Sequence, residues 1–286
     1  MEFKEKIGII DVGGGLRGIY PAGIFDYLLD NDIHIPYCLG ISAGSANVAS
    51  YISRQKGRNK VFFQEYSSDR KYMSILNLIT KGSFVDLDYI YGTLSNEGGK
   101  NPWDFDKAIK SEQEMVVQMG NAKTGKADYI YKKDFKKNNY GFLCASSCIP
   151  IVCKPYTFNG VEYYDGGVVD PIPYKKAFGD GCTRVIVVLT RPRDFRRTLG
   201  RDSKSYKKLQ NKYPEFVKAL YNRPTLYNSE LEEIINDLEP QGKVLLIAPD
   251  DICGMGTLTK DKAKLQKLYE KGYKDGEKIK EWLENI

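Results

Sequence analysis

The sequence predicts an α/β fold, a three-layer α/β/α sandwich around a mainly parallel central sheet. An apolar strand expected at residues 6–12 is followed by a glycine loop and a helical pattern, and a second strand at 35–41 runs directly into another helix start. Two strands joined by one helix form a βαβ unit, which is nearly always right-handed and parallel. Further apolar strands at 184–189 and 243–248 continue the alternation of strands and helices.

The first two strands and the helix between them have the patterns that a buried βαβ unit requires. Residues 7–10 carry no charge, which suits a strand covered on both faces. Apolar residues recur at near-helical spacing over 19–29. Pro36 lies near the start of the second strand, where its missing N–H is tolerated. The helix after that strand is expected to begin at Ser42.

The remaining elements are expected in a cap, two strand pairs and two helices. Residues 57–112 are mostly polar with helical character, and we expect an inserted cap over the site. The two strand pairs are residues 114–119 with 127–131, and 152–158 with 161–164 around Asn159-Gly160, which is typical of a two-residue hairpin. A buried helix or loop is expected at 140–147, and a long terminal helix at 259–283.

Composition narrows the class of protein. The chain of 286 residues is 42% apolar, and no apolar stretch approaches the roughly 18–20 residues that span a bilayer. Residues 1–6 lack the features of a secretory signal, so we expect a cytoplasmic protein whose contact with membranes is peripheral. The net charge of +6 is modest and no nucleic-acid-binding module is present, so no nucleic-acid partner is expected. With one histidine and six scattered cysteines, the sequence predicts reduced thiols, no metal site and no cofactor.

The segment Gly40-Ile41-Ser42-Ala43-Gly44 fits the Gly-x-Ser-x-Gly pattern of a nucleophile elbow. A strand that turns abruptly into a helix needs glycines where side chains would clash. Ser42 then lies at a helix N-terminus, where free N–H groups stabilise negative charge. The expected strand before Ser42 and helix after it are the context that this motif requires.

The glycine loop Gly13-Gly14-Gly15-Leu16-Arg17-Gly18 also has the Gly-x-Gly-x-x-Gly spacing of a dinucleotide site. That hypothesis needs an acidic residue at the end of the second strand, whereas Asp30 and Asp32 precede this strand. The favoured alternative is an oxyanion hole, because consecutive glycine N–H groups can face a developing oxyanion unobstructed. Since both the loop and Ser42 follow parallel strands, we expect them at the same edge of the sheet.

The general base is the remaining question. His34 precedes the strand that ends at Ser42, so we expect it at the opposite edge of the sheet, out of reach. Either the chain lacks serine chemistry or a carboxylate is the base. Asp165 is the best candidate, because it follows an apolar-aromatic strand and two glycines, Gly166 and Gly167, leave space beside it. An Asp-Gly pair on its own is more typical of a hairpin turn.

Taken together, these motifs resemble the patatin-like phospholipase family. The resemblance includes residues 11–18, 40–44 and 165–167, and also Ala145-Ser146-Ser147-Cys148-Ile149-Pro150 before the aspartate. It covers about residues 6–190, in the right order. Val12 departs from the family pattern, in which a polar or acidic residue is frequent at this place.

The resemblance implies a Ser42–Asp165 dyad, an oxyanion hole from the backbone of Gly13, Gly14 and Gly15, and no metal for the chemistry. Gly18, Gly40, Gly44, Gly166 and Gly167 support the motifs, and Arg17 contacts either a substrate head group or a surface carboxylate. The implied activity is lipid acyl hydrolysis of the phospholipase A, lysophospholipase or esterase type, through an acyl-enzyme. Two alternatives stay open: an acyltransferase with the same dyad, or a non-catalytic module that binds lipid or nucleotide.

We expect one domain in which residues 191–286 complete the catalytic part at 6–190. Basic residues are dense between Arg191 and Arg223, interleaved with aromatic and apolar ones. One interpretation is an amphipathic element that docks on anionic lipid. The favoured interpretation is a solvated helix face whose aromatic residues pack on the core.

Overall fold

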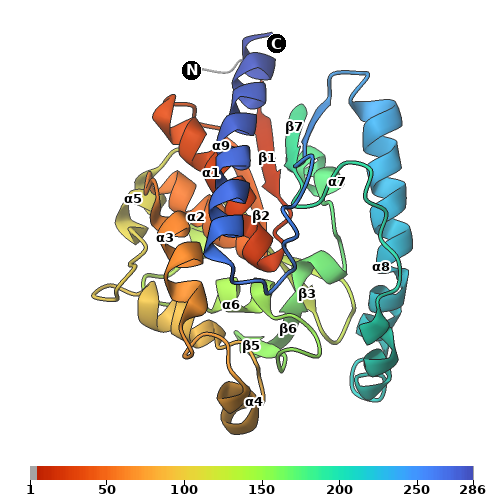
Figure 1. The fold of residues 1–286 in the computed structure, drawn as a ribbon. Coiled ribbons are helices and arrows are strands. Elements are labelled where there is room, and N and C mark those ends of the chain that lie inside the picture. The colour runs from red at the N-terminus through yellow and green to blue at the C-terminus, as the bar shows by residue number, and fades with distance from the viewer. Residues whose placement is uncertain (1–4, 286) are drawn as a thin grey trace.

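An eight-stranded mixed sheet forms the centre of the computed structural model, which describes residues 5–285 except for the side chains of 201 and 202 (Figure 1). Residues 1–4, on which the expected absence of a secretory signal partly rests, lie outside the described residues. The strand order is β5-β6-β3-β2-β1-β7-β8, and β4 pairs with β3. The strands are β1 (Ile7–Asp11), β2 (Tyr37–Ile41), β3 (Glu114–Asn121), β4 (Ala127–Tyr131), β5 (Tyr156–Phe158), β6 (Val161–Asp165), β7 (Arg184–Val188) and β8 (Val244–Ile247).

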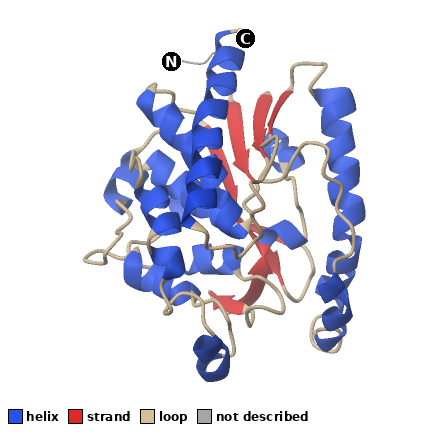
Figure 2. Ribbon diagram, viewed as in Figure 1, coloured by secondary structure: helices blue, strands red, loops and turns tan. Residues whose placement is uncertain are grey.

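Helices cover both faces of this sheet (Figures 1 and 2). The α-helices are α1 (Ile19–Asp30), α2 (Ala43–Ile52), α3 (Arg58–Gln64), α4 (Ile75–Lys81), α5 (Phe105–Lys110), α6 (Gly141–Ser147), α7 (Tyr174–Gly179), α8 (Pro214–Glu233) and α9 (Lys262–Glu284), with a π-helix at Asp88–Leu94. Side chains alternate along β1, so Ile9 packs with α1, α2 and α9 while Ile10 packs with α7 and α8. The predicted three-layer sandwich is therefore confirmed.

Strands β3, β2, β1, β7 and β8 run parallel to one another, whereas β4 and β6 pair antiparallel with β3, and β5 pairs antiparallel with β6. Strands β2 and β5 begin later in the structure than the strands predicted at 35–41 and 152–158. β2 begins after Pro36, and β5 begins after Pro155 because neither proline has an N–H to donate. Before Pro155 the chain is turned, since Cys153 N donates to Ile149 O at 2.9 Å.

α9 lies along α1, and the two helices approach through glycines (Figure 1). A Cβ placed on Gly272 would lie 1.9 Å from Tyr20 O, and one on Gly23 would lie 2.2 Å from Tyr269 O. Both neighbours are backbone atoms, which cannot move without displacing a helix. The C-terminal helix is therefore fitted closely to the first βαβ unit.

Replacing Gly272 by alanine is expected to destabilise the protein by about 2 kcal/mol, because overpacking outweighs the gain in helix propensity. Gly179→Ala is the matched control, since a Cβ at Gly179 meets nothing within 4 Å. Urea unfolding followed by circular dichroism measures both variants. Equal unfolding midpoints for the two would contradict a close α1–α9 contact.

Candidate active site

Ser42 lies at the sharp turn between β2 and α2. Its backbone has φ 56° and ψ −130°, a conformation that L-residues rarely adopt. The turn is held because Ser42 N donates to Ser146 Oγ at 2.8 Å, and Ser146 Oγ donates to Gln118 O at 2.7 Å. Ser146 comes from the buried helix α6, in the segment that precedes the aspartate. The strained turn at a serine is the geometry of a nucleophile elbow.

The register of β3 brings Asp165 to Ser42. Ile41 at the end of β2 pairs with Gln118, and Asp165 at the end of β6 pairs with Met119. Because β4 pairs along the other edge of β3, β6 lies on the same edge as β2, and the C-terminal end of β6 follows directly beyond the C-terminal end of β2. The two strands run in opposite directions, and their ends therefore place Ser42 and Asp165 at the same position in the sheet.

Asp165 is 8% exposed, and Ser42 is 6% exposed. Burial raises the pKa of Asp165, while a hydrogen bond from Ser42, the charge of Arg223 and the N–H of Gly167 oppose the rise. The Gly167 bond to Asp165 Oδ1 measures 2.9 Å. A buried carboxylate beside a serine hydroxyl is poised to accept a proton.

Asp11, to which the sequence analysis gave no role, organises the glycine loop. Its buried carboxylate accepts from Gly13 N at 2.9 Å and from Asn47 Nδ2 at 2.8 Å. Burial raises the pKa of Asp11 to about 7, against these two hydrogen bonds. A lone acidic residue at the end of an apolar strand, just before the loop, was the pattern that could have revealed it.

The N–H groups of the loop differ in their availability. Gly13 N is engaged by Asp11, and Gly13 O accepts from Thr190 Oγ1 at 2.5 Å. Among residues 5–285, the N–H groups of Gly14 and Gly15 have no hydrogen-bond partner. The loop lies against the elbow, because a Cβ on Gly13 would be 3.0 Å from Ser42 Cβ. Gly14 and Gly15 thus offer the free donors near Ser42.

The other motif glycines are sites of close approach. A Cβ at any of them would come within 3.3 Å of a neighbouring atom: Gly18, Gly40, Gly44, Gly166 and Gly167. Gly44 shows the tightest approach, 2.3 Å from Asp11 O. A side chain at that position would push the elbow away from the glycine loop.

Two pockets of different chemistry meet at Ser42. The first is apolar and is formed largely by the region of the expected cap, with walls that include Phe62, Phe63, Tyr72, Leu87, Ile90 and Leu94. The second has a volume of about 260 Å³ and also contains the glycine loop and Asp165. Ser42 lines both pockets, so one side of this residue faces apolar side chains and the other faces polar groups.

Four arginines line the second pocket: Arg17, Arg191, Arg197 and Arg223. Asp165 is the one carboxylate among its described lining residues. Burial, reinforced by the charges of the other three, lowers the pKa of Arg17 to about 9, and burial with Arg223 and Arg191 lowers that of Arg197 to about 10. The pocket therefore concentrates positive charge beside the glycine loop.

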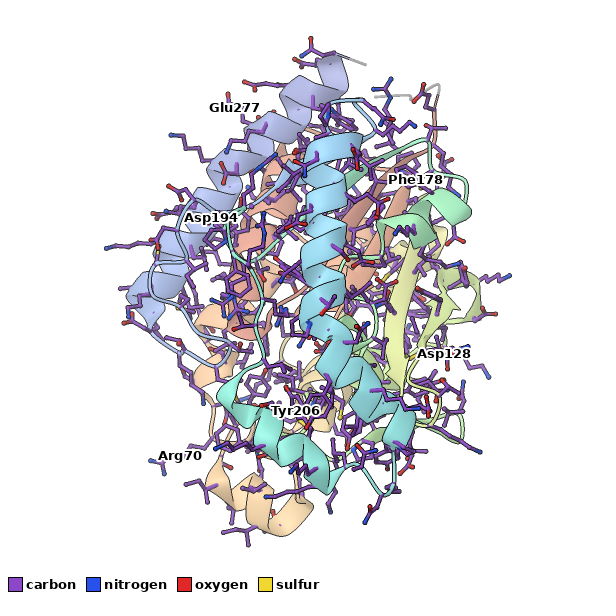
Figure 3. The ribbon with its side chains drawn as sticks, turned by 90° about the vertical axis from the view of Figure 1, so that its right-hand side faces the viewer. Arg70, Asp128, Phe178, Asp194, Tyr206 and Glu277 are labelled. Carbon is purple, nitrogen blue, oxygen red and sulfur yellow. The ribbon has the colours of Figure 1, made fainter. Side chains whose placement is uncertain are left out.

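These arginines are held in place from several elements. Arg17 Nε donates to Thr190 O at 3.2 Å, and its Nη1 donates to Thr257 Oγ1 at 3.1 Å. Arg197 lies over the ring of Tyr227, and its buried Nε has no partner in the described part of the chain. α8, which carries Arg223 and Tyr227, crosses the front of the view in Figure 3.

The basic segment between Arg191 and Arg223 agrees only in part with the interpretation favoured from the sequence. Its apolar members Tyr213, Phe216 and Leu220 are buried, as the favoured interpretation expected. Arg191, Arg197 and Arg223, however, line the pocket beside Ser42 rather than a solvated face or a lipid-docking surface. Nothing in the sequence separates these three arginines from the other basic residues around them.

His34 lies before β2, at the strand end opposite Ser42, where its Nε2 is 2.9 Å from Asp32 Oδ1. All six cysteines are free. Within residues 5–285, no cluster of three or more histidine, cysteine or acidic side chains is arranged to hold a metal ion. No helix in this part of the chain is both long and apolar enough to cross a bilayer.

The fold and the site define the family. The family model described as patatin-like phospholipase matches residues 12–178, which include the glycine loop, the elbow and Asp165. The chain therefore belongs to the patatin-like phospholipase family. A second model, a domain of unknown function named DUF6363, matches residues 213–286, which span α8 to α9.

Several characterised and uncharacterised proteins are similar to this chain. The uncharacterized protein YjjU of Escherichia coli K12 is 27% identical over 65% of this chain and 52% of its own length. A lysophospholipase of Aspergillus terreus is 23% identical over 98% of this chain but 18% of its own length. The chain thus spans about half of the first relative and a small part of the second. The solved structure of VipD from Legionella pneumophila matches with a TM-score of 0.48 and 12% identity, over 97% of this chain and 67% of that one.

Proposed function

We propose that this chain hydrolyses carboxylic esters of phosphate-bearing lipids, with Ser42 as nucleophile and Asp165 as general base. The observation that carries the proposal is the position of Ser42, which borders an apolar pocket on one side and an arginine-lined pocket on the other. Membership of the patatin-like phospholipase family and the similarity to the Aspergillus terreus lysophospholipase support the same reaction class.

The reaction proceeds in two steps. Ser42 Oγ attacks the ester carbonyl carbon while its proton passes to Asp165, and the carbon–oxygen bond to the alcohol then breaks. The leaving alcohol takes the proton from Asp165, and an acyl group remains on Ser42. A water molecule then gives a proton to Asp165 and attacks this acyl carbon, which releases the fatty acid and returns the proton to Ser42.

The oxyanion of each tetrahedral intermediate accepts hydrogen bonds from the glycine loop. Gly14 and Gly15 supply the donors, because their N–H groups are free in the described structure whereas Gly13 N is bound to Asp11. Gly13 instead fixes the loop through Asp11 and Thr190. Such fixed donors stabilise charge that develops only in the transition state.

The two pockets bind different parts of the substrate. Phe62, Ile90 and Leu94 belong to the pocket that takes the acyl chain, since hydrocarbon is stabilised by apolar walls. The arginine-lined pocket takes the phosphate of the leaving alcohol, because guanidinium groups bind phosphate through paired hydrogen bonds. Because residues from 191 onward supply part of this pocket, we also propose that 191–286 completes one domain with 6–190.

Arg197→Gln is expected to lower the preference for a phosphate-bearing ester over a neutral one by about tenfold or more, since a buried charged hydrogen bond is lost. The measurement compares kcat/KM for a monoacylglycerol phosphate and for a monoacylglycerol with the same acyl chain. Arg193→Gln is the control, because Arg193 pairs with Glu239 at the surface and does not line the pocket. An unchanged ratio in Arg197→Gln would contradict the assignment of the head-group pocket.

A further inference from the structure

Helix α4 exposes its large apolar side chains to solvent. Ile75, Leu76, Leu78 and Ile79 are 70%, 65%, 46% and 76% exposed. Four large aliphatic residues within a helix of seven residues leave almost no polar face on the outside. The helix projects from one end of the molecule, at the bottom of Figures 1 and 3. An apolar patch of this kind marks an interaction surface.

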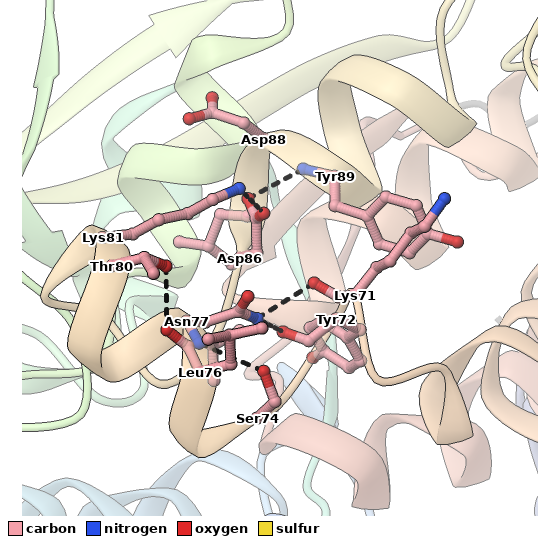
Figure 4. A network of polar contacts seen from close by, with 12 residues as sticks. Lys71, Tyr72, Ser74, Leu76, Asn77, Thr80, Lys81, Asp86, Asp88 and Tyr89 are labelled. Carbon is pink, nitrogen blue, oxygen red and sulfur yellow. Dashed lines mark hydrogen bonds and ion pairs between the residues drawn. The ribbon is translucent and has the colours of Figure 1, made fainter.

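Polar groups help to hold α4 on the body of the protein (Figure 4). The Ser74 side chain caps the helix by accepting from Asn77 N at 3.1 Å. Asn77 is buried, and its Nδ2 donates to Lys71 O at 3.0 Å and to Tyr72 O at 3.3 Å. At the other end, Lys81 pairs with the buried Asp86. The amphipathic pattern is inverted relative to a helix that packs on a core.

The rim of α4 is basic. Arg70, Lys71, Lys81 and Lys154 are exposed around it, and Lys154 lies over Gly82 directly after the helix. Three acidic residues near the helix already have partners, and one of them, the exposed Asp88, accepts from the Tyr156 hydroxyl at 2.8 Å (Figure 4). Asp86 is buried against Lys81, and Asp69 accepts from Tyr89 and from Lys71 N. The surroundings of the apolar residues thus hold more basic side chains than acidic ones, and the acidic ones are all engaged in hydrogen bonds or ion pairs.

α4 is connected to the apolar pocket of the active site. Tyr72 precedes the helix, Val85 follows it, and both line that pocket. The bridge between Met73 and Val85 ties the two flanking segments together. Ile151, on the neighbouring segment, adds another exposed apolar side chain. The segments on both sides of α4 therefore contribute side chains to the wall of the pocket beside Ser42.

We infer that α4 docks the protein on an anionic lipid bilayer, with its four aliphatic side chains in the outer hydrocarbon region and its basic rim among the head groups. Two features of the helix fit this occupant. Aliphatic side chains gain free energy when they leave water for the acyl region, and each basic residue near an anionic surface adds attraction. A second copy of the chain would bring the same basic rim against this one, which opposes self-association through α4.

Flotation with lipid vesicles tests this assignment without relying on enzyme activity. Wild-type protein is expected to bind vesicles of phosphatidylcholine mixed with phosphatidylserine. The double variant Ile75→Ser, Ile79→Ser is expected to bind at least about tenfold more weakly, because two inserted aliphatic side chains are lost. Ile109→Ser is the matched control, since Ile109 is an exposed isoleucine on a different helix, α5. Thermal unfolding checks that all variants remain folded.

A second pair of variants tests the basic rim. Arg70→Gln with Lys71→Gln is expected to weaken binding to the anionic vesicles by about tenfold, while binding to pure phosphatidylcholine vesicles stays the same. In the variant Leu78→Trp, the fluorescence gained over wild type is expected to shift to the blue when anionic vesicles are added. Wild-type protein that does not float with vesicles, or a double isoleucine variant that binds as well as Ile109→Ser, would overturn the assignment. A dimer in light scattering that the isoleucine changes dissociate would do so too, since a second copy would then cover α4.

Discussion

Replacing Ser42 by alanine, or Asp165 by asparagine, is expected to lower kcat/KM for a soluble nitrophenyl ester by at least about 10³-fold. Without Ser42 no acyl-enzyme forms. Without the carboxylate of Asp165 the serine keeps its proton, and the described structure places no histidine within reach to replace this base. Because the two residues act as a unit, the double variant is expected to be no worse than either single one.

The control for Asp165→Asn is Asp170→Asn. Asp170 follows shortly after β6, and burial raises its pKa to about 6, but it does not line either pocket at Ser42. Its replacement is expected to leave the rate within a few-fold of wild type. The comparison separates the general effect of removing a buried carboxylate, present in both variants, from the loss of the general base, which occurs only in Asp165→Asn. A rate that survives in Ser42→Ala would rule out this nucleophile.

Gly14→Ala is expected to reduce kcat by about 10²- to 10³-fold, comparable with the loss of one oxyanion-hole donor. Gly14 has φ 147°, and a Cβ there would lie 2.3 Å from Thr190 Oγ1. The loop must move to relieve this contact, which displaces the free N–H groups of Gly14 and Gly15. Because the oxyanion develops on the way to the tetrahedral intermediate and is absent from the bound ester, the loss is expected in kcat with little change in KM.

Gly98→Ala is the matched control for this prediction. Gly98 also has a positive φ, of 80°, but a Cβ there meets nothing within 4 Å and the residue does not line the site. Both variants therefore carry backbone strain, and only one disturbs the loop. A Gly14→Ala enzyme with normal kcat and a raised KM would assign the loop to substrate binding instead of to the oxyanion.

The fold and the elbow could be predicted because local patterns determine them. The apolar strands β1 and β2 each run into a glycine-rich turn and a helix, and this succession specifies a parallel βαβ unit. The same topology places the loop and Ser42 at one edge of the sheet. The pairing of Asp165 with Met119 depends on register between distant strands, so the sequence alone could only name this residue as a candidate.

Other features depend on tertiary contacts that no local pattern encodes. Arg197 and Arg223 resemble the basic residues around them in sequence, and only the path of α8 brings them to the pocket. The outward orientation of Ile75 and Ile79 follows from the anchoring of buried Asn77, which a hydrophobic pattern would have placed outside. Strand β5 begins only after Pro155, because Pro155 has no N–H to donate. The strand predicted at 152–158 did not take this missing donor into account.

The most direct test of the proposed chemistry is covalent labelling with a fluorophosphonate, followed by mass spectrometry of the peptides. The reagent transfers its phosphonyl group to an activated serine and to no resting hydroxyl. We expect a single label on Ser42 in the wild-type protein, and a label that is lost or strongly slowed in Asp165→Asn. A label on another serine, or equal labelling of wild type and Asp165→Asn, would contradict the Ser42–Asp165 dyad.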